Sequence, residues 1–214
     1  GGTMKIAYTL DLQFLDPQLV QSDQDLLPST LIFGRLVQWD ATMLDPQPDV
    51  AESWTISDDN LTYVFTLRPG LTFHSGREVT ADDVVFSFQR ALDTGDKGRG
   101  KAELRDVDSF TATGPREFTV KMKQPSAVFM TSCGHWALPI LNKDTIDNID
   151  VAPDGTGPFT FGEWIPGDHA SYNKNPNYWN TEALAGWPDE IVSQPISEAL
   201  TRIANLKAGQ VDLV

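Results

Sequence analysis

A mixed α/β fold, interrupted by a strand-rich segment, is what the sequence predicts. The chain begins and ends with strands and helices in alternation, whereas short strands and turns dominate from Asp40 to about Met122. Hydrophobic residues make up 40% of the 214 residues and aromatic residues 10%. These values are typical of a chain that buries a core and exceed those of disordered segments.

The N-terminal part predicts a strand followed by a helix. Apolar and polar side chains alternate over residues 5–9, as in a half-buried strand. Pro17 turns the chain, because its ring fixes φ and disfavours helix at the residue before it. A helix is expected after the polar run 21–25, with Pro28 in its first turn, where a missing N–H costs least.

The middle of the chain predicts a hairpin and a capped helix. Apolar residues recur at period two from Leu61 to Leu67, directly after the turn 57–60. Thr80 and Asp83 have the spacing of a capping box and are expected to begin a helix. The glycines of residues 95–100 predict a flexible polar loop, and a short helix is expected over 127–133.

The C-terminal part predicts a β-α-β unit. Strands are expected at 159–161 and 190–192, separated by a surface stretch. Ser197 is expected to cap the following helix and Gly209 to end it. Residues 211–214 begin a further strand, so we interpret the chain as an N-terminal fragment.

The charge balance excludes two classes of partner. Lys and Arg number 16 against 30 Asp and Glu, which gives a formal net charge of −14. Binding to nucleic acid or to an anionic membrane surface needs clustered positive charge, so neither is expected. The sequence also lacks an apolar run of the roughly 18 residues that span a bilayer, and it predicts no signal peptide at its start.

The sequence offers little support for an enzyme or for a resident metal. The three histidines are far apart and lack zinc-ligand spacing, and Gly155-Thr156-Gly157 lacks the lysine of a phosphate loop. His74 is expected to be a solvated strand residue. Cys133, the only cysteine, is expected to be a small buried hydrophobe, with a disulfide partner in missing downstream sequence as the alternative. No cofactor is predicted.

One aromatic pair stands apart from the predicted core. Trp136 follows His135 on a loop after a predicted helix, and Gly134 before them permits close backbone approach. An aromatic ring beside an imidazole on a loop suits the wall of a ligand site, although a core tryptophan fits the pattern equally well.

Several short sequence motifs follow one another in an order that is more specific for a protein family than any single motif. This order resembles that of the extracytoplasmic solute-binding proteins of ABC importers, in the peptide- and nickel-binding branch, and the motifs span nearly the whole chain. They are Leu15-Asp16-Pro17-Gln18, Gly34-Arg35-Leu36-Val37, Pro48-Asp49-Val50-Ala51-Glu52-Ser53-Trp54, Ser57-Asp58-Asp59-Asn60-Leu61-Thr62-Tyr63, Leu67-Arg68-Pro69-Gly70-Leu71-Thr72-Phe73-His74-Ser75-Gly76, Thr80-Ala81-Asp82-Asp83-Val84-Val85-Phe86-Ser87, Gly155-Thr156-Gly157-Pro158-Phe159, Asn175-Pro176-Asn177-Tyr178-Trp179 and Gly209-Gln210-Val211-Asp212.

The resemblance implies an incomplete first lobe of a periplasmic binding protein. Residues 1–39 and 153–214 would form two parts of the lobe core, and residues 40–152 would form an inserted strand-rich subdomain. A second lobe would close over the ligand, and the family's second lobe is absent from this sequence.

The resemblance also implies ligand-binding positions. The residues after the Leu15-Asp16-Pro17 turn and the loop before Leu138 line the cleft in this family. The candidates are Gln21, Ser22, Asp23, Asp25, His135 and Trp136.

The function that follows is capture of a solute without catalysis. The expected solute is a short peptide, delivered to membrane permease subunits by an extracytoplasmic protein that is a monomer at full length. A chelated metal, an oligosaccharide or an opine-like compound is the alternative cargo. A hydrolase with paired carboxylates and a sensor-linked receptor domain are the alternatives from other classes.

Overall fold

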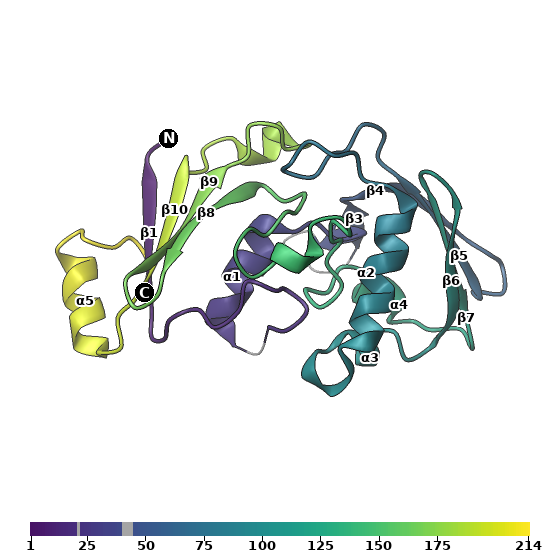
Figure 1. Cartoon of the computed structure of the whole chain (residues 1–214), viewed down its shortest axis with the longest axis horizontal. Helices are drawn as coiled ribbons and strands as arrows, with labels where there is room; N and C mark the ends of the chain where they lie inside the picture. Colours follow the sequence, from purple (N-terminus) through teal and green to yellow (C-terminus); the bar gives the residue numbers. More distant parts are fainter. Residues whose placement is uncertain (21, 40–44) are drawn as a thin grey trace.

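Two four-stranded sheets lie at opposite ends of the computed structural model, which describes residues 1–20, 22–39 and 45–214 (Figure 1). The first sheet has the strand order β1-β10-β9-β8. Its β1 and β10 run parallel, and the other neighbours are antiparallel. The mixed α/β prediction is therefore confirmed. The bounds are β1 Thr3–Tyr8, β8 Phe159–Ile165, β9 His169–Lys174 and β10 Glu190–Pro195.

The second sheet is antiparallel throughout and has the order β4-β5-β7-β6. The predicted hairpin joins its first two strands, and Asn60 in the turn has a φ of 57°. The capping box is also confirmed, because the Asp83 carboxylate accepts a hydrogen bond from Thr80 N at 2.9 Å. The bounds are β4 Ala51–Ile56, β5 Thr62–Leu67, β6 Val107–Gly114, β7 Glu117–Met122 and α2 Ala81–Asp93.

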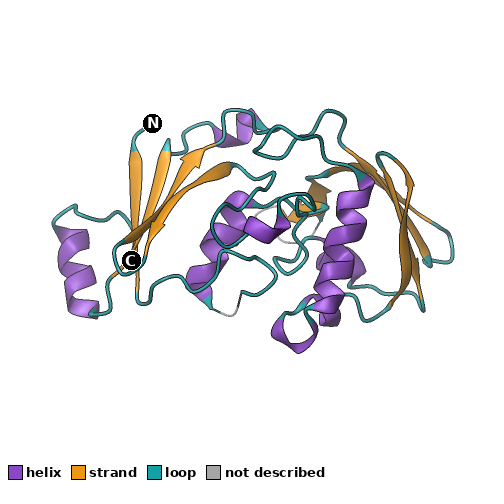
Figure 2. Ribbon diagram, viewed as in Figure 1, coloured by secondary structure: helices purple, strands orange, loops and turns teal. Residues whose placement is uncertain are grey.

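Helices fill the space between the sheets. Figure 2 shows α1 and α2 lying between them, whereas α5 lies outside the first sheet. Across the described residues, the structure contains no helix with the length and apolar character needed to cross a membrane. The remaining elements are α1 Asp23–Ile32, β2 Val37–Trp39, β3 Pro46–Pro48, η1 Gly95–Lys97, α3 Gly100–Glu103, α4 Phe129–Cys133, η2 Ile146–Asn148, η3 Thr181–Leu184 and α5 Ala199–Lys207.

Three local predictions were wrong. Pro28 lies in the second turn of α1, because the helix already begins at Asp23. The stretch expected at the surface contains β9, whose Tyr172 is completely buried between two neighbouring strands. Glu198, not Ser197, is the N-cap of α5, and the carbonyl of Ser197 instead accepts a hydrogen bond from Arg202 at 3.0 Å.

Each sheet has its own hydrophobic core, and polar contacts join the two. Arg90 of α2 makes a bidentate ion pair with the buried Asp16, with 3.1 Å from Nη1 to Oδ1 and 2.5 Å from Nη2 to Oδ2. Gln18 Nε2 donates to the carbonyl of Ser87 at 2.8 Å. The loop after β1 is thereby held against α2.

The core of the second sheet depends on Phe118. Its ring is fully buried and lies 5.1 Å from the Phe88 ring centroid and 6.3 Å from that of Phe65. We expect Phe118→Ala to lower the free energy of unfolding by about 3–5 kcal/mol, because it removes apolar contacts and leaves a cavity. Urea denaturation measures the change. Thr111→Ala, at an exposed position of β6, is the control and is expected to stay within about 0.5 kcal/mol; equal losses in both variants would contradict the assignment of this core.

Candidate functional site

A pocket of about 210 Å³ lies at the start of α1, and we name it the α1 pocket. Three of the residues predicted as ligand contacts, Ser22, Asp23 and Trp136, line it together although Trp136 lies far from the other two in the sequence. The lining is completed by residues that the sequence did not single out. These are Val20, Leu26 and Arg99.

The start of α1 is held by a buried carboxylate. Asp25 is fully buried and accepts hydrogen bonds from Gln13 N at 2.7 Å and from Phe14 N at 3.3 Å. The Ser22 hydroxyl donates to the same carboxylate. Asp25 is therefore occupied in fixing the loop and does not line the α1 pocket, so its solute contact stays a prediction. Gln21 lies outside the described residues.

The opposite wall comes from the loop after α4. A Cβ on Gly134 would lie 2.3 Å from Nε1 of Trp39, so only glycine permits the loop to approach that indole. The rings of the next two residues, His135 and Trp136, contact each other at a tilt of 34°, with 4.9 Å between their centroids. Trp136 reaches the pocket, whereas His135 lies behind it and accepts a hydrogen bond from Ala137 N at 3.2 Å.

His135 lies among charges of both signs. Burial lowers its pKa below the ordinary value for histidine, Glu103 at 3.8 Å opposes that change, and the positive charges of Arg99 and Arg35 lower the pKa further. The ring is therefore neutral near pH 7. A neutral imidazole behind Trp136 adds no charge to the pocket wall.

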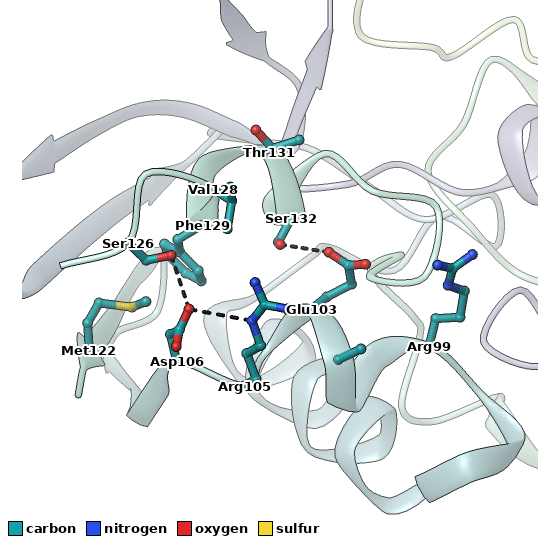
Figure 3. A pocket seen from close by; sticks show the side chains of 11 residues that line it. Arg99, Glu103, Arg105, Asp106, Met122, Ser126, Val128, Phe129, Thr131 and Ser132 are labelled. Atoms are coloured by element: carbon teal, nitrogen blue, oxygen red, sulfur yellow. Dashed lines mark hydrogen bonds and ion pairs between the residues drawn. The ribbon is translucent and has the colours of Figure 1, made fainter. Parts of the chain in front are cut away.

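A second cavity, of about 300 Å³, lies between α3 and α4 (Figure 3). Its acidic side chains already have partners: Glu103 accepts from Ser132 Oγ at 2.7 Å, and Asp106 pairs with Arg105 at 3.7 Å. Arg99 borders both this cavity and the α1 pocket. The two spaces are thus neighbours that share one cationic side chain.

The buried thiol and the imidazoles do not form a metal centre in the described part of the chain, which holds no group of three or more His, Cys, Asp or Glu side chains that could bind a metal. Cys133 is fully buried in the core of the second sheet, and burial raises its pKa well above the ordinary value for a thiol. This agrees with a structural role as a small hydrophobe.

The prediction for His74 was wrong, because its ring packs against the loop 155–157 instead of facing solvent. Its Nε2 lies 3.0 Å from the carbonyl of Gly157, which only accepts hydrogen bonds, so Nε2 carries the hydrogen. Nδ1 is buried and has no hydrogen-bond partner among the residues that the structure describes. Burial lowers the pKa of His74, because it disfavours the charged form more than the hydrogen bond to Gly157 and the negative charge of Asp154 favour it.

We expect His74 to make the protein less stable as the pH falls. The folded state has the lower pKa, so the unfolded state binds the proton more readily and the free energy of unfolding decreases as the pH falls below about 6.5. Urea denaturation at pH 7.5 and pH 5.5 measures the decrease. His74→Gln should show a smaller decrease between the two pH values, whereas an unchanged pH dependence in this variant would contradict the assignment.

The fold and the family match define this chain as part of a bacterial extracellular solute-binding protein. The family model described as bacterial extracellular solute-binding proteins, family 5, middle, matches residues 45–214, and the chain belongs to this family. The predicted resemblance is therefore confirmed.

Similar proteins bind different solutes on this framework. Heme-binding protein A of Haemophilus influenzae is 32% identical, over 87% of this chain and 38% of that protein. Di/tripeptide-binding protein 1 of Pseudomonas aeruginosa is 31% identical, over 85% of this chain and 38% of that protein. The chain thus spans about two fifths of the length of these relatives, which are named as binding proteins and not as enzymes.

A solved structure shows the same architecture. The periplasmic binding protein DppA from Helicobacter pylori, in complex with the peptide STSA, is 28% identical and superimposes with a TM-score of 0.86. The match covers 98% of this chain and 46% of that one. The agreement with part of a longer binding protein confirms the predicted fold class.

Proposed function

We propose that the whole protein carrying this chain captures a short peptide outside the cytoplasm and delivers it to the permease of an ABC importer. The observation that carries the proposal is the convergence of Ser22, Asp23 and Trp136 on the α1 pocket. The chain would supply one wall of the solute site. The names of the di/tripeptide-binding relative and of the peptide complex support the choice of solute.

The chemistry of the pocket suits a peptide. Trp136 and Leu26 offer apolar surface to the aliphatic parts of a solute, and Ser22 Oγ, which donates its hydrogen to Asp25, can accept a hydrogen bond. The Asp23 carboxylate can pair with the ammonium group of a peptide N-terminus through a charge-assisted hydrogen bond. None of these contacts breaks a bond in the solute, which agrees with capture and release.

The proposed mechanism is a shift between two conformations. Residues 1–39 and 153–214 would form one lobe, with residues 40–152 as its insertion, and a solute that contacts a second lobe as well would favour the closed form. A ligand shifts such an equilibrium only by its higher affinity for the closed state. The closed monomer would then dock on the permease.

Heme is the alternative cargo that a specific observation favours, because a relative of 32% identity is named a heme-binding protein. Thermal-shift measurements on the whole protein with tri-alanine, hemin, a nickel chelate and an oligosaccharide distinguish the cargo classes. Stabilisation by tri-alanine supports the proposal, and stabilisation by hemin alone overturns the peptide assignment.

We expect Trp136→Ala to weaken binding of tri-alanine about tenfold or more, because it removes the aromatic wall of the α1 pocket. Isothermal titration calorimetry measures the affinity. Trp187→Ala is the matched control, since Trp187 is also half-exposed but packs on Phe159, at 6.0 Å between ring centroids, outside the α1 pocket. An equal loss in both variants would remove Trp136 from the proposed site.

A further inference from the structure

We propose that Arg99 binds a carboxylate of the captured solute, so that the α1 pocket selects solutes with an anionic group. The inference rests on the proposed function, which makes this pocket part of the solute site. Among the described residues that line the pocket, Arg99 is the only cation, and the lining also includes the carboxylate of Asp23. A pocket with both charges matches a solute that carries an ammonium group and a carboxylate.

The first argument is that the guanidinium group of Arg99 is uncommitted. Within the described residues, its side chain makes no hydrogen bond or ion pair. In Figure 3 it lies at the edge of the second cavity, and no dashed line joins it to the other side chains drawn. The neighbouring Arg105, which is also exposed, pairs with Asp106 at 3.7 Å. Arg90 and Arg77 are likewise held by carboxylates, those of Asp16 and Asp83.

The second argument is that the backbone on both sides of Arg99 is packed closely. A Cβ on Gly98 would lie 2.5 Å from the carbonyl oxygen of Gln18, and a Cβ on Gly100 would lie 2.4 Å from Cβ of Ala91. Both distances are shorter than real Cβ contacts allow, so each glycine permits a close approach that a side chain would prevent.

This packing gives the glycines of residues 95–100 a different role from the one that the sequence predicted. The sequence predicted a flexible loop over 95–100, but the glycines at 98 and 100 press the backbone of Arg99 against the loop after β1 and against α2. Arg99 is thereby positioned beside the α1 pocket. The packing fixes the backbone of Arg99 and leaves its side chain free, and the planar fork of a guanidinium loses less conformational entropy for each hydrogen bond it forms than a lysine does.

The third argument is electrostatic. With a net charge of −14, this chain repels anions. An anionic group of the solute therefore needs a local positive charge at the site. Charge-assisted hydrogen bonds from a guanidinium to a carboxylate are stronger than hydrogen bonds between neutral groups. Arg99 supplies that charge, and the peptide carboxyl end would face it.

The test compares a peptide acid with its amide. Calorimetry on the whole protein measures the affinity of tri-alanine and of tri-alaninamide, which differ only in the C-terminal group, a carboxylate in one and a neutral amide in the other. We expect the wild type to prefer the acid about ten- to hundredfold. Arg99→Gln should abolish this preference by weakening the acid alone, and Arg99→Lys should keep part of it, since lysine retains the charge but not the fork.

Arg105→Gln is the matched control, because it removes the same charge from a neighbouring exposed position that does not line the α1 pocket. It should bind both peptides as the wild type does. The inference is overturned if Arg99→Gln binds the acid as tightly as the wild type, if it weakens acid and amide equally, or if Arg105→Gln loses as much.

Failure of the proposed function is distinguishable from failure of this inference. If the wild type binds neither peptide, the peptide assignment fails alone, and Arg99 is then tested with propionate as an isolated carboxylate. Nitrogen-15 NMR should show a saturable shift of the Arg99 Nε resonance and none for Arg105. The absence of a shift at Arg99, or equal shifts at both arginines, overturns the inference.

Discussion

The bidentate ion pair between Asp16 and Arg90 is the interaction on which the arrangement of the site depends. It joins the loop after β1, which belongs to one hydrophobic core, to α2, which belongs to the other. Asp16 is almost fully buried, and a buried charge that lost its partner would be strongly destabilising. The ion pair therefore sets the position of the loop that leads into the α1 pocket, and Gly98 packs against the same loop at Gln18.

A second polar network joins the cores on another side of the molecule. The Asp83 carboxylate serves two purposes, because it closes the capping box with Thr80 and also binds Arg77 through both oxygens. Arg77 Nε reaches Asn142 at 2.9 Å, and Asn142 in turn donates to Asp154 at 2.6 Å. One helix start is thus tied to the loop before β8, close to the buried ring of His74.

Such a framework can serve several solutes without changing its fold. The relatives named for heme and for di- and tripeptides match nearly the same length of this chain, so the solute is not set by the sheets. The α1 pocket is lined largely by residues near a helix start and in loops, which rigid elements on both sides position. We therefore expect this chain to discriminate among solutes by three features: the negative charge of Asp23, the positive charge of Arg99 and the aromatic face of Trp136.

The sequence alone determined the features that depend on near neighbours in the chain. The hairpin ending at Leu67 and the capping box at Thr80 follow from spacing, because their partners lie a few residues away. The order of short motifs identified the family and pointed to Ser22, Asp23 and Trp136, which the structure brings together. The location of the pocket was thus predictable in part.

Only the tertiary structure decided the features that depend on distant partners. The burial of β9, the neutral ring of His74 and the occupied carboxylate of Asp25 each require a segment that the local pattern does not reveal. Arg99 is the clearest case. In the sequence, a glycine on either side of Arg99 indicates a flexible backbone. Its position became evident only when Gln18 and Ala91 were seen packed against those glycines, because steric contact is a property of the folded chain.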